Sequence, residues 1–420
     1  MGFTKDLWTS KVRQPDGTIK RERNARWGKG KRWLAVWHDE SGRERSKAFP
    51  VKESADKCWP TMETDVARGE YVDRKAGKEK ICDVGRRWLK SRVVDPTSAI
   101  KYETSWRVHV EPEFGNRSVS SVKPSEVQDW LARLGGEYEN PTLCTAYLVL
   151  QGLFELAVAD GQRKDNPARS SVVTKPSSSS GDKVRVWSDA VVGSIIDAHP
   201  EQLRLLPVLE AGCGIRIGEG LGLGEADFDF DEHVLHVRRQ LKKLGTEHIF
   251  GLPKNDRERD VPMPSWVEVM AQQHFRRFPS RPVTLPWEKV TGRLVIVQLA
   301  FTRPAGSYTR YRDYSQHVWK PALVQVGLIP PPTGTSRSLK YATTRHEGPH
   351  QLRHFYASIM LADGASIIEL AEYLGHHDPA VTLRIYGHLQ PNSHDKARKI
   401  IDARMFRPRA VSGGPGERPE

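Results

Sequence analysis

The 420-residue sequence has few cysteines and no long apolar segment. Cys58, Cys82, Cys144 and Cys213 lie far apart and form no C-x-x-C pair, which disfavours a disulfide framework and a thiolate zinc site. We therefore expect a reducing, cytosolic compartment. No apolar stretch approaches the roughly 18 residues of a membrane-spanning helix, and the N-terminus is charged where a signal peptide needs an apolar core. The sequence thus predicts a soluble protein that is not secreted.

Positive charge is in excess and is unevenly distributed. The chain has 65 Lys and Arg against 52 Asp and Glu, for a formal net charge of +13 and a pI near 9.5. Residues 1–50 hold 13 of the basic and 6 of the acidic residues, so this segment alone contributes +7. Such an excess predicts a polyanionic partner and says nothing about the fold.

The length of the chain predicts two or three domains, and its patterns predict a mainly α fold with small β-sheets. Residues 1–75 are predicted to form a small ββ(β)α module, with a β-hairpin over residues 31–49. A helix should follow from Glu53 to Arg68, and Pro60 should kink or split it. Basic residues flank both strands, so the sheet is a candidate for a DNA groove. The alternative is a solvated basic face.

Residues 78–168 are predicted to form a compact four-helix domain. Pro124 suits the first position of its helix, because the N–H that proline lacks is not needed there. The last segment is apolar over enough of its circumference to lie at the centre of a bundle. The predicted helices span Ile81–Ser91, Ser98–Val110, Pro124–Leu134 and Thr142–Asp160.

The second half of the chain begins after a change in composition. Residues 169–183 contain a proline and a run of four serines, which predicts a linker. Residues 184–406 are predicted to form a larger mixed α+β domain with a strand region at Phe228–Met263. Residues 407–420 are rich in Pro and Gly, which predicts a disordered tail.

One motif match is misleading. His346-Glu347-Gly348-Pro349-His350 spells H-E-x-x-H, the zinc metalloprotease signature, which works only on a continuous helix. Proline inside a helix costs about 3 kcal/mol, so the helix should begin at Pro349 and not run through it. We expect no zinc site here, and the sequence indicates no other metal or cofactor.

A helix that begins at Pro349 has a clear apolar face. On a helical wheel, His350 and Arg353 lie roughly 60° apart and point away from that face. They are therefore expected to lie outside the core, where an exposed His/Arg pair is usually solvated surface. The apolar face consists of Leu352, Phe355, Tyr356 and Ile359.

Two shorter helices should follow. Ser366-x-x-Glu369 forms a capping box, and Gly375 provides the C-terminal stop. Asp378, with Pro379 behind it, can cap the next helix, so His376 lies in the tight turn between the two. Tyr386 then falls about two turns into the second helix, where a tyrosine by itself usually packs in a core.

Three runs of residues resemble the signature boxes of the tyrosine recombinase (phage integrase) family in order and spacing. The resemblance is strong over residues 184–405. The helical domain looks like the SAM-like core-site-binding domain of that family, and residues 1–75 look like the arm-site-binding domain of mobile-element integrases. The three runs are Gly214–Glu219, His350–His354, and Leu374–His376 followed by Tyr386–His388.

The resemblance implies metal-free and ATP-independent DNA cleavage and rejoining. Tyr386 would attack the scissile phosphate and form a 3′-phosphotyrosyl bond. His350 would manage the tyrosine proton, and Lys254 would protonate the leaving 5′-oxygen. Because tyrosine has a pKa near 10, it needs a cationic surround or a base to act as a nucleophile.

The same resemblance gives the remaining cations a role. Arg216 and Arg353 would hold the non-bridging phosphate oxygens, and His376 would donate to the phosphate. Planar guanidinium groups bind such oxygens bidentately and can supply the electrostatic stabilisation that a metal otherwise provides. Glu219 either orients Arg216 or lies on the surface, and the sequence leaves both interpretations open.

The catalytic lysine is also open to an alternative. Lys254 precedes a basic strand that ends in an apolar-Pro run at Val261-Pro262, as is usual in the family. Lys242 and Lys243 in the preceding strand are the alternatives.

Glycines at 218, 220 and 222 each cost up to about 1 kcal/mol in a helix, which weakens the prediction of a helix next to Arg216.

The resemblance further implies partners and a location. We expect double-stranded DNA with core and arm attachment sites, a homo-tetramer on DNA, and an excisionase and a host DNA-bending protein as further partners. The amphipathic segment Asp395–Phe406 would dock on a neighbouring protomer. The expected location is the cytoplasm of a bacterial host, associated with the nucleoid. Alternatives are a resolvase or invertase of the same family, or a catalytically silent DNA-binding regulator.

Overall fold

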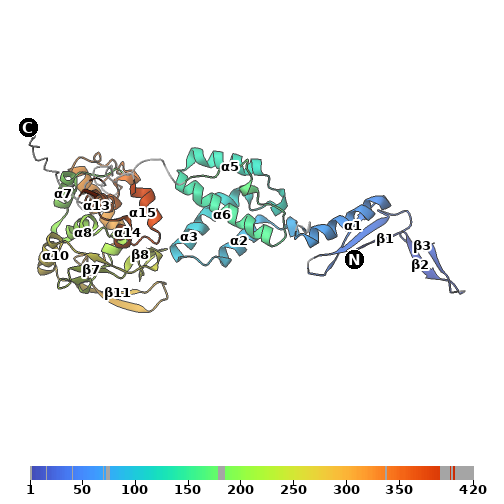
Figure 1. The fold of residues 1–420 in the computed structure, drawn as a ribbon, viewed down its shortest axis with the longest axis horizontal. Coiled ribbons are helices and arrows are strands. Elements are labelled where there is room, and N and C mark those ends of the chain that lie inside the picture. The colour runs from blue at the N-terminus through green and yellow to red at the C-terminus, as the bar shows by residue number, and fades with distance from the viewer. Residues whose placement is uncertain are drawn as a thin grey trace, which may run out of the picture. The chain divides into compact units, whose positions relative to one another are not determined.

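The structure is a computed structural model that describes residues 2–15, 17–39, 41–69, 71, 76–177, 185–335, 338–387, 398 and 401–402. The chain divides into two compact units, residues 1–180 and 181–420 (Figure 1). The first unit holds a small β-sheet module and a helical domain. The second holds the mixed α+β domain.

The N-terminal module is an antiparallel three-stranded sheet packed on one helix. Strands β1 (Phe3–Asp6), β4 (Trp33–His38) and β5 (Glu44–Phe49) lie in the order β1-β4-β5. Helix α1 (Lys52–Ala67) covers the face that carries Trp33, Ala35 and Trp37. The predicted hairpin over residues 31–49 is therefore confirmed.

Two features of this module differ from the predictions. Strands β2 (Thr9–Arg13) and β3 (Ile19–Arg23) form an additional hairpin that was not predicted. Helix α1 runs through Pro60 as one helix, so the predicted split is wrong. Pro60 lies on the exposed side of α1, where water can reach the carbonyl that loses its N–H partner.

The helical domain contains helix in all four predicted segments. A π-helical turn continues α3, and the short α4 follows it. The helices are α2 (Ile81–Ser91), α3 (Pro96–Ser105), α4 (Glu111–Phe114), α5 (Pro124–Glu137) and α6 (Asn140–Ala159). By length and composition α6 passes for a membrane span, contrary to our expectation, but it is the core helix of this domain, with Val149, Leu150 and Leu153 fully buried.

Part of the predicted linker packs on the helical domain. Val173 is buried in the core of that domain, and the backbone N–H of Thr174 donates to Gln128 at 2.7 Å. Composition alone therefore underestimated the order of residues 170–177, because a buried apolar side chain and a hydrogen bond to α5 hold this segment on the domain. The run 178–184, the segment Asp395–Phe406 except 398 and 401–402, and the predicted tail lie outside the described residues.

The second unit consists of helices and small sheets (Figure 1). Their buried apolar side chains form its main core. The strand region predicted at Phe228–Met263 is confirmed, whereas the β11–β12 hairpin was not predicted. One sheet has three strands in the order β10-β7-β6, formed by β6 (Phe228–Asp229), β7 (Val234–Val237) and β10 (Arg259–Pro262). Two hairpins pair β8 (Gln240–Leu244) with β9 (Glu247–Gly251) and β11 (Arg281–Pro286) with β12 (Leu294–Leu299). The helices include α7 (Asp189–Asp197), α8 (Leu205–Cys213), α9 (Ile217–Gly220), α10 (Ser265–Arg277), α11 (Tyr311–Tyr314), α12 (Lys320–Gln325), α13 (His350–Ala362), α14 (Ile367–Leu374) and α15 (Pro379–Tyr386).

Two helix ends bring the site together. Helix α8 packs against α13 and ends at Gly214, whose φ of 62° is left-handed. Any Cβ at Gly214 would also collide with the ring of Tyr356. Helix α14 ends in the same way at Gly375, with φ 62°, as the capping pattern predicted. Asp378 accepts from the backbone of α15, so the predicted boundary between α14 and α15 is confirmed.

Candidate active site

Tyr386 lies at the C-terminal end of α15 and is only 1% exposed. Its hydroxyl oxygen lies 2.7 Å from Nδ1 of His354 on α13, within hydrogen-bonding distance. Burial raises the pKa of Tyr386 to about 12, against the opposing effect of the charges of Arg353 and Arg216. The tyrosine hydroxyl is therefore neutral at neutral pH.

His354 belongs to the candidate site by its contact with Tyr386, and sequence reasoning missed it. Burial, followed by the charge of Arg353, lowers its pKa to about 4, so the ring is neutral and its Nδ1 can accept the tyrosine proton. The ring of His350 lies edge-on to it, with 4.8 Å between centroids, and His350 is on the exposed side. The i, i+4 spacing of these two histidines was visible in the sequence, but the contact with Tyr386 was not.

Arg353 is 1% exposed, so the expectation that it points to solvent is wrong. Its guanidinium donates to the carbonyls of Gly214, at 2.6 Å, and Leu374, at 2.5 Å, and it lies 3.3 Å from Nε2 of His376. These carbonyls end α8 and α14, where the helix dipoles favour a cation. Burial, followed by the charge of Arg216, lowers the pKa of Arg353 to about 9, which leaves it charged at neutral pH.

Glu219 connects two further arginines. It is fully buried, so the interpretation of Glu219 as a surface residue is wrong. Its carboxylate accepts from Arg216 at 2.8 Å and from Arg259 at 2.6 and 3.1 Å. Burial alone would raise the pKa of Glu219, but the charges and hydrogen bonds of Arg259, and then the charge of Arg216, lower it to about 2. The carboxylate thus fixes both arginines.

We expect Glu219→Gln to lower the free energy of unfolding at pH 7 by about 3–5 kcal/mol, because it breaks a buried ion pair and leaves two arginines uncompensated. The depressed pKa means that this contribution exists above the ordinary carboxyl pKa and is lost as pH falls towards about 2. The stability difference between parent and variant should therefore shrink on acidification. Urea unfolding at several pH values measures it.

Glu210 on α8 provides the matched control. It is also buried, but burial raises its pKa well above the ordinary value and both carboxyl oxygens lack a hydrogen-bond partner among the described residues. Because Glu210 forms no ion pair or side-chain hydrogen bond among the described residues, Glu210→Gln should change stability far less than Glu219→Gln. Equal losses in the two variants would contradict the ion-pair account of Glu219.

His376 lies in the turn between α14 and α15, as predicted. Its Nδ1 is 2.7 Å from Oγ1 of Thr382, and its carbonyl accepts from Arg257 at 2.8 Å. Burial, followed by the charges of Arg353 and other cations that include Lys254, lowers the pKa of His376 to about 4. Lys254 itself is exposed, in a 3-10 turn at Lys254–Asp256 between β9 and β10.

The cluster carries a surplus of positive charge. Arg216, Arg259 and Arg353 are charged, whereas Glu219 is the only carboxylate that the structure pairs with any of them within the described residues. Burial raises the pKa of Glu210 well above its ordinary value, and Glu210 forms no ion pair with these arginines among the described residues. The arginines of the cluster therefore outnumber the carboxylates that pair with them next to a buried tyrosine, and this arrangement suits a phosphate anion.

The H-E-x-x-H match is broken, as predicted. His346 lies in a separate 3-10 turn, and α13 begins at His350 with Pro349 as its N-cap. Within the part of the chain that the structure describes, no three His, Cys, Asp or Glu side chains gather as metal ligands.

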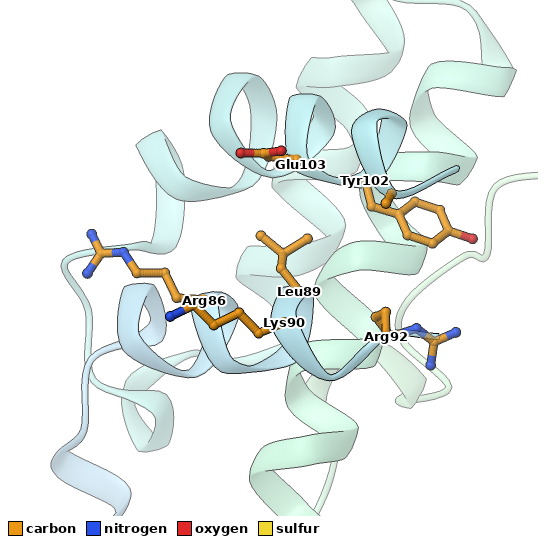
Figure 2. A pocket seen from close by; sticks show the side chains of 7 residues that line it. Arg86, Leu89, Lys90, Arg92, Tyr102 and Glu103 are labelled. Atoms are coloured by element: carbon orange, nitrogen blue, oxygen red, sulfur yellow. The ribbon is translucent and has the colours of Figure 1, made fainter. Parts of the chain in front are cut away.

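The helical domain has a basic pocket of its own. It has a volume of about 300 Å³ and lies between α2 and α3. Figure 2 shows Leu89 pointing between the two helices, with Arg86 and Arg92 extending to opposite sides. Lys90 and Glu103 also line it, so the pocket is amphipathic with a positive rim.

Comparisons with known proteins agree on one family. The model of the phage integrase family matches residues 333–393, which contain α13, α14 and α15. A tyrosine recombinase XerC-like protein of Caldanaerobacter subterraneus is 25% identical over 88% of this chain and 94% of its own length. An integrase of Mycobacterium phage D29 is 26% identical over 45% of this chain and 50% of its own length.

Solved structures have the same fold. The integrase of transposon Tn1549, in complex with transposon right-end DNA, superposes with a TM-score of 0.61 at 20% identity, over 78% of this chain and 99% of that one. A lambda integrase tetramer bound to a Holliday junction gives a TM-score of 0.51 at 12% identity, over 82% of this chain and 94% of that one.

Proposed function

Because this chain belongs to the phage integrase family of tyrosine recombinases, we propose that it is the integrase of a mobile element. It cleaves and rejoins DNA at specific sites through a covalent 3′-phosphotyrosyl intermediate. The observation that carries the proposal is the buried Tyr386 next to a surplus of arginine charge.

In this proposal two arginines bind the scissile phosphate. Arg216 and Arg353 donate to its non-bridging oxygens and stabilise the charge that develops there during attack. Glu219 orients Arg216 through the 2.8 Å hydrogen bond. His376, whose Nε2 lies 3.3 Å from Arg353, donates to the same phosphate once that nitrogen carries a proton.

Lys254 protonates the leaving 5′-oxygen. Its exposed position in the turn before β10 allows the side chain to reach DNA, and its charge already acts on His376. Lys242 and Lys243 on β8 remain the alternatives. The phosphotyrosyl bond conserves the energy of the broken phosphodiester, so rejoining needs no ATP.

Two histidines handle the tyrosine proton. His354 accepts it first, because its Nδ1 already holds the Tyr386 hydroxyl at 2.7 Å. His350, in edge contact with His354 and on the exposed side, passes the proton on. A bound phosphate raises the proton affinity of both rings, since its negative charge favours their protonated forms.

We expect His354→Asn to slow single-turnover cleavage by about a hundredfold or more, the usual contribution of general base catalysis. Asparagine can still accept a hydrogen bond but cannot take the proton. DNA affinity should stay at the parental value, which a binding titration checks. If His354→Asn cleaves at the parental rate while His350→Asn does not, the proton passes directly to His350.

In this proposal, different domains contact the core and arm sites of the DNA. The helical domain (78–168) and catalytic domain (184–406) clamp the core site, and the module at 1–75 contacts arm sites. The protein acts as a homo-tetramer on DNA in the bacterial cytoplasm, at the nucleoid, with an excisionase and a host DNA-bending protein as further partners. The Tn1549 integrase in complex with DNA supports the DNA contacts, and the lambda integrase tetramer bound to a Holliday junction supports the tetramer.

Covalent trapping tests the function. The protein is incubated in chelator with a nicked core site that cannot be religated, and the products are run on a denaturing gel. The core site is sought as a short direct repeat next to the gene for this protein. A covalent adduct supports the integrase, whereas its absence on the cognate site would leave only a silent DNA-binding regulator. Recombination between directly repeated sites within one plasmid separates a resolvase from an integrase.

A further inference from the structure

The β2–β3 hairpin of the N-terminal module buries almost nothing. Nine of its ten strand residues are exposed, and Thr9 is half-buried. A two-stranded hairpin without a buried face is at best marginally stable in water. Its own packing therefore gives no reason for this hairpin to be present.

The basic residues of the hairpin gather on one face. The register pairs Lys11 with Arg21, Thr9 with Arg23 and Arg13 with Ile19, so these side chains share a face. Lys11 and Arg21 lie directly opposite each other, and like charges in that position are destabilising. Within the described residues, neither they nor Arg13 have a carboxylate partner. The other face is neutral in sum, with Lys20 and Glu22.

A cluster of aromatic and arginine side chains connects the hairpin to the sheet. The guanidinium of Arg23 lies 4.0 Å from the ring centroid of Trp27, which in turn lies 5.8 Å from Trp8. Arg32 contacts both rings and forms a 3.0 Å ion pair with the buried Asp6. The hydrogen bonds from Arg32 lower the pKa of Asp6 to about 2, so this pair persists at neutral pH.

The sheet itself is a poor candidate for the same role. Helix α1 covers the face with Trp33 and Ala35. The opposite face carries one lysine, Lys5, and one glutamate, Glu44, so the charges of these two side chains cancel. By contrast, residues 9–32 contain nine Lys and Arg against two Asp and Glu, which equals the whole excess of the first 50 residues. The positive charge lies on the hairpin and the segment after it.

We propose that the β2–β3 hairpin is a DNA-binding ribbon that places Lys11, Arg13 and Arg21 against the phosphates of duplex DNA. Each strand has five residues, or about 17 Å, and a two-stranded ribbon fits the major groove, which is about 12 Å wide. Contacts to phosphate add affinity and position without reading sequence. The inference rests on the proposed recombinase function and identifies the part of the module that meets DNA.

The competing explanation is protection of an exposed strand edge. Lysine and arginine on edge strands prevent aggregation, and this role needs no ligand. Removing the charges would then lower solubility and leave DNA affinity unchanged. Salt dependence separates the two explanations, because each lost phosphate contact makes the negative slope of log K against log salt shallower by about 0.9.

The experiment uses the full-length protein and a fluorescent duplex without any attachment sequence. The test variant is Lys11→Gln/Arg13→Gln/Arg21→Gln. The matched control is Lys52→Gln/Lys57→Gln/Arg68→Gln, which removes the same charge from exposed positions on or next to α1. The test variant should bind at least about tenfold more weakly at about 0.1 M salt, with a slope reduced by about 2 to 3. The control should stay within about twofold of the parent.

Three further measurements keep the result decisive. A charge-preserving variant, Lys11→Arg/Arg13→Lys/Arg21→Lys, should retain the parental slope, and thermal unfolding should show no loss of stability in the test variant. An unchanged slope in the test variant, or an equal loss in the control, overturns the proposal. A loss confined to single-stranded DNA or RNA overturns it as well.

The experiments can contradict the hairpin proposal and the recombinase proposal independently. The test variant should form the parental amount of covalent adduct on a short core site, because the hairpin lies outside the catalytic domain. If the parent forms no adduct, the recombinase proposal fails while the salt slopes still decide the hairpin. If the test variant loses the adduct at saturating protein, the hairpin is no separate DNA contact.

Discussion

Tyr386→Phe is expected to abolish the covalent protein–DNA adduct completely while DNA affinity stays at the parental value. The substitution removes only the hydroxyl oxygen that would form the phosphotyrosyl bond. The ring is buried with Tyr356 and Leu374, so phenylalanine fits the same space. The lost hydrogen bond to His354 should cost about 1 kcal/mol of stability. The assay is trapping on a nicked core site, with affinity measured in parallel.

Tyr356→Phe is the control for this prediction. Tyr356 belongs to the same apolar cluster and is also buried, but its ring packs against Gly214 and it has no role in the proposed chemistry. It should form the parental amount of adduct. An adduct that persists in Tyr386→Phe and disappears in another tyrosine variant would move the nucleophile elsewhere.

Local patterns predicted helix boundaries well. Ser366 and Glu369 form the expected capping box, and Gly375 takes the left-handed conformation that ends α14. Asp378 and Pro379 begin α15. These signals involve side chains and backbone a few residues apart, so they act before any tertiary contact exists. The turn that holds His376 could therefore be predicted from sequence.

Burial of the site could not be predicted in the same way. A helical wheel places Arg353 opposite the apolar face, yet carbonyls from Gly214 and Leu374 surround its guanidinium. Gly214 is 139 residues distant along the chain, so only the packing of α8 on α13 reveals the contact. The hydrogen bond between Tyr386 and His354 arises likewise from helices that meet in three dimensions.

The β2–β3 hairpin escaped prediction for a different reason. Strands are recognised by apolar residues at alternate positions, and this pattern exists because one face is buried. Here both faces are exposed, and Val12 and Ile19 are the only large apolar residues in the two strands. The sequence signal was a local excess of basic residues, which indicates a ligand better than it indicates a strand.

Arg353→Lys is expected to lower the single-turnover cleavage rate by about two to three orders of magnitude, with a smaller effect on DNA affinity. Lysine keeps the positive charge, but one ammonium cannot bind the carbonyls of Gly214 and Leu374 and also present two donors to phosphate oxygens. The lost interactions therefore matter most in the transition state, where charge develops on those oxygens. Quench-flow measurement on the nicked core site gives the rate.

Arg384→Lys is the matched control, because Arg384 is exposed on α15, two residues before Tyr386, and has no partner among the described residues. It should cleave within about threefold of the parent, as surface changes rarely alter more. Arg353→Ala with added guanidinium ion separates an effect on chemistry from an effect on folding. If guanidinium partly restores the cleavage rate at concentrations that leave thermal unfolding unchanged, the guanidinium group of Arg353 acts on the phosphate. If Arg353→Lys cleaves as fast as Arg384→Lys, the buried guanidinium supports the fold alone, and Arg216 must stabilise the transition state without it.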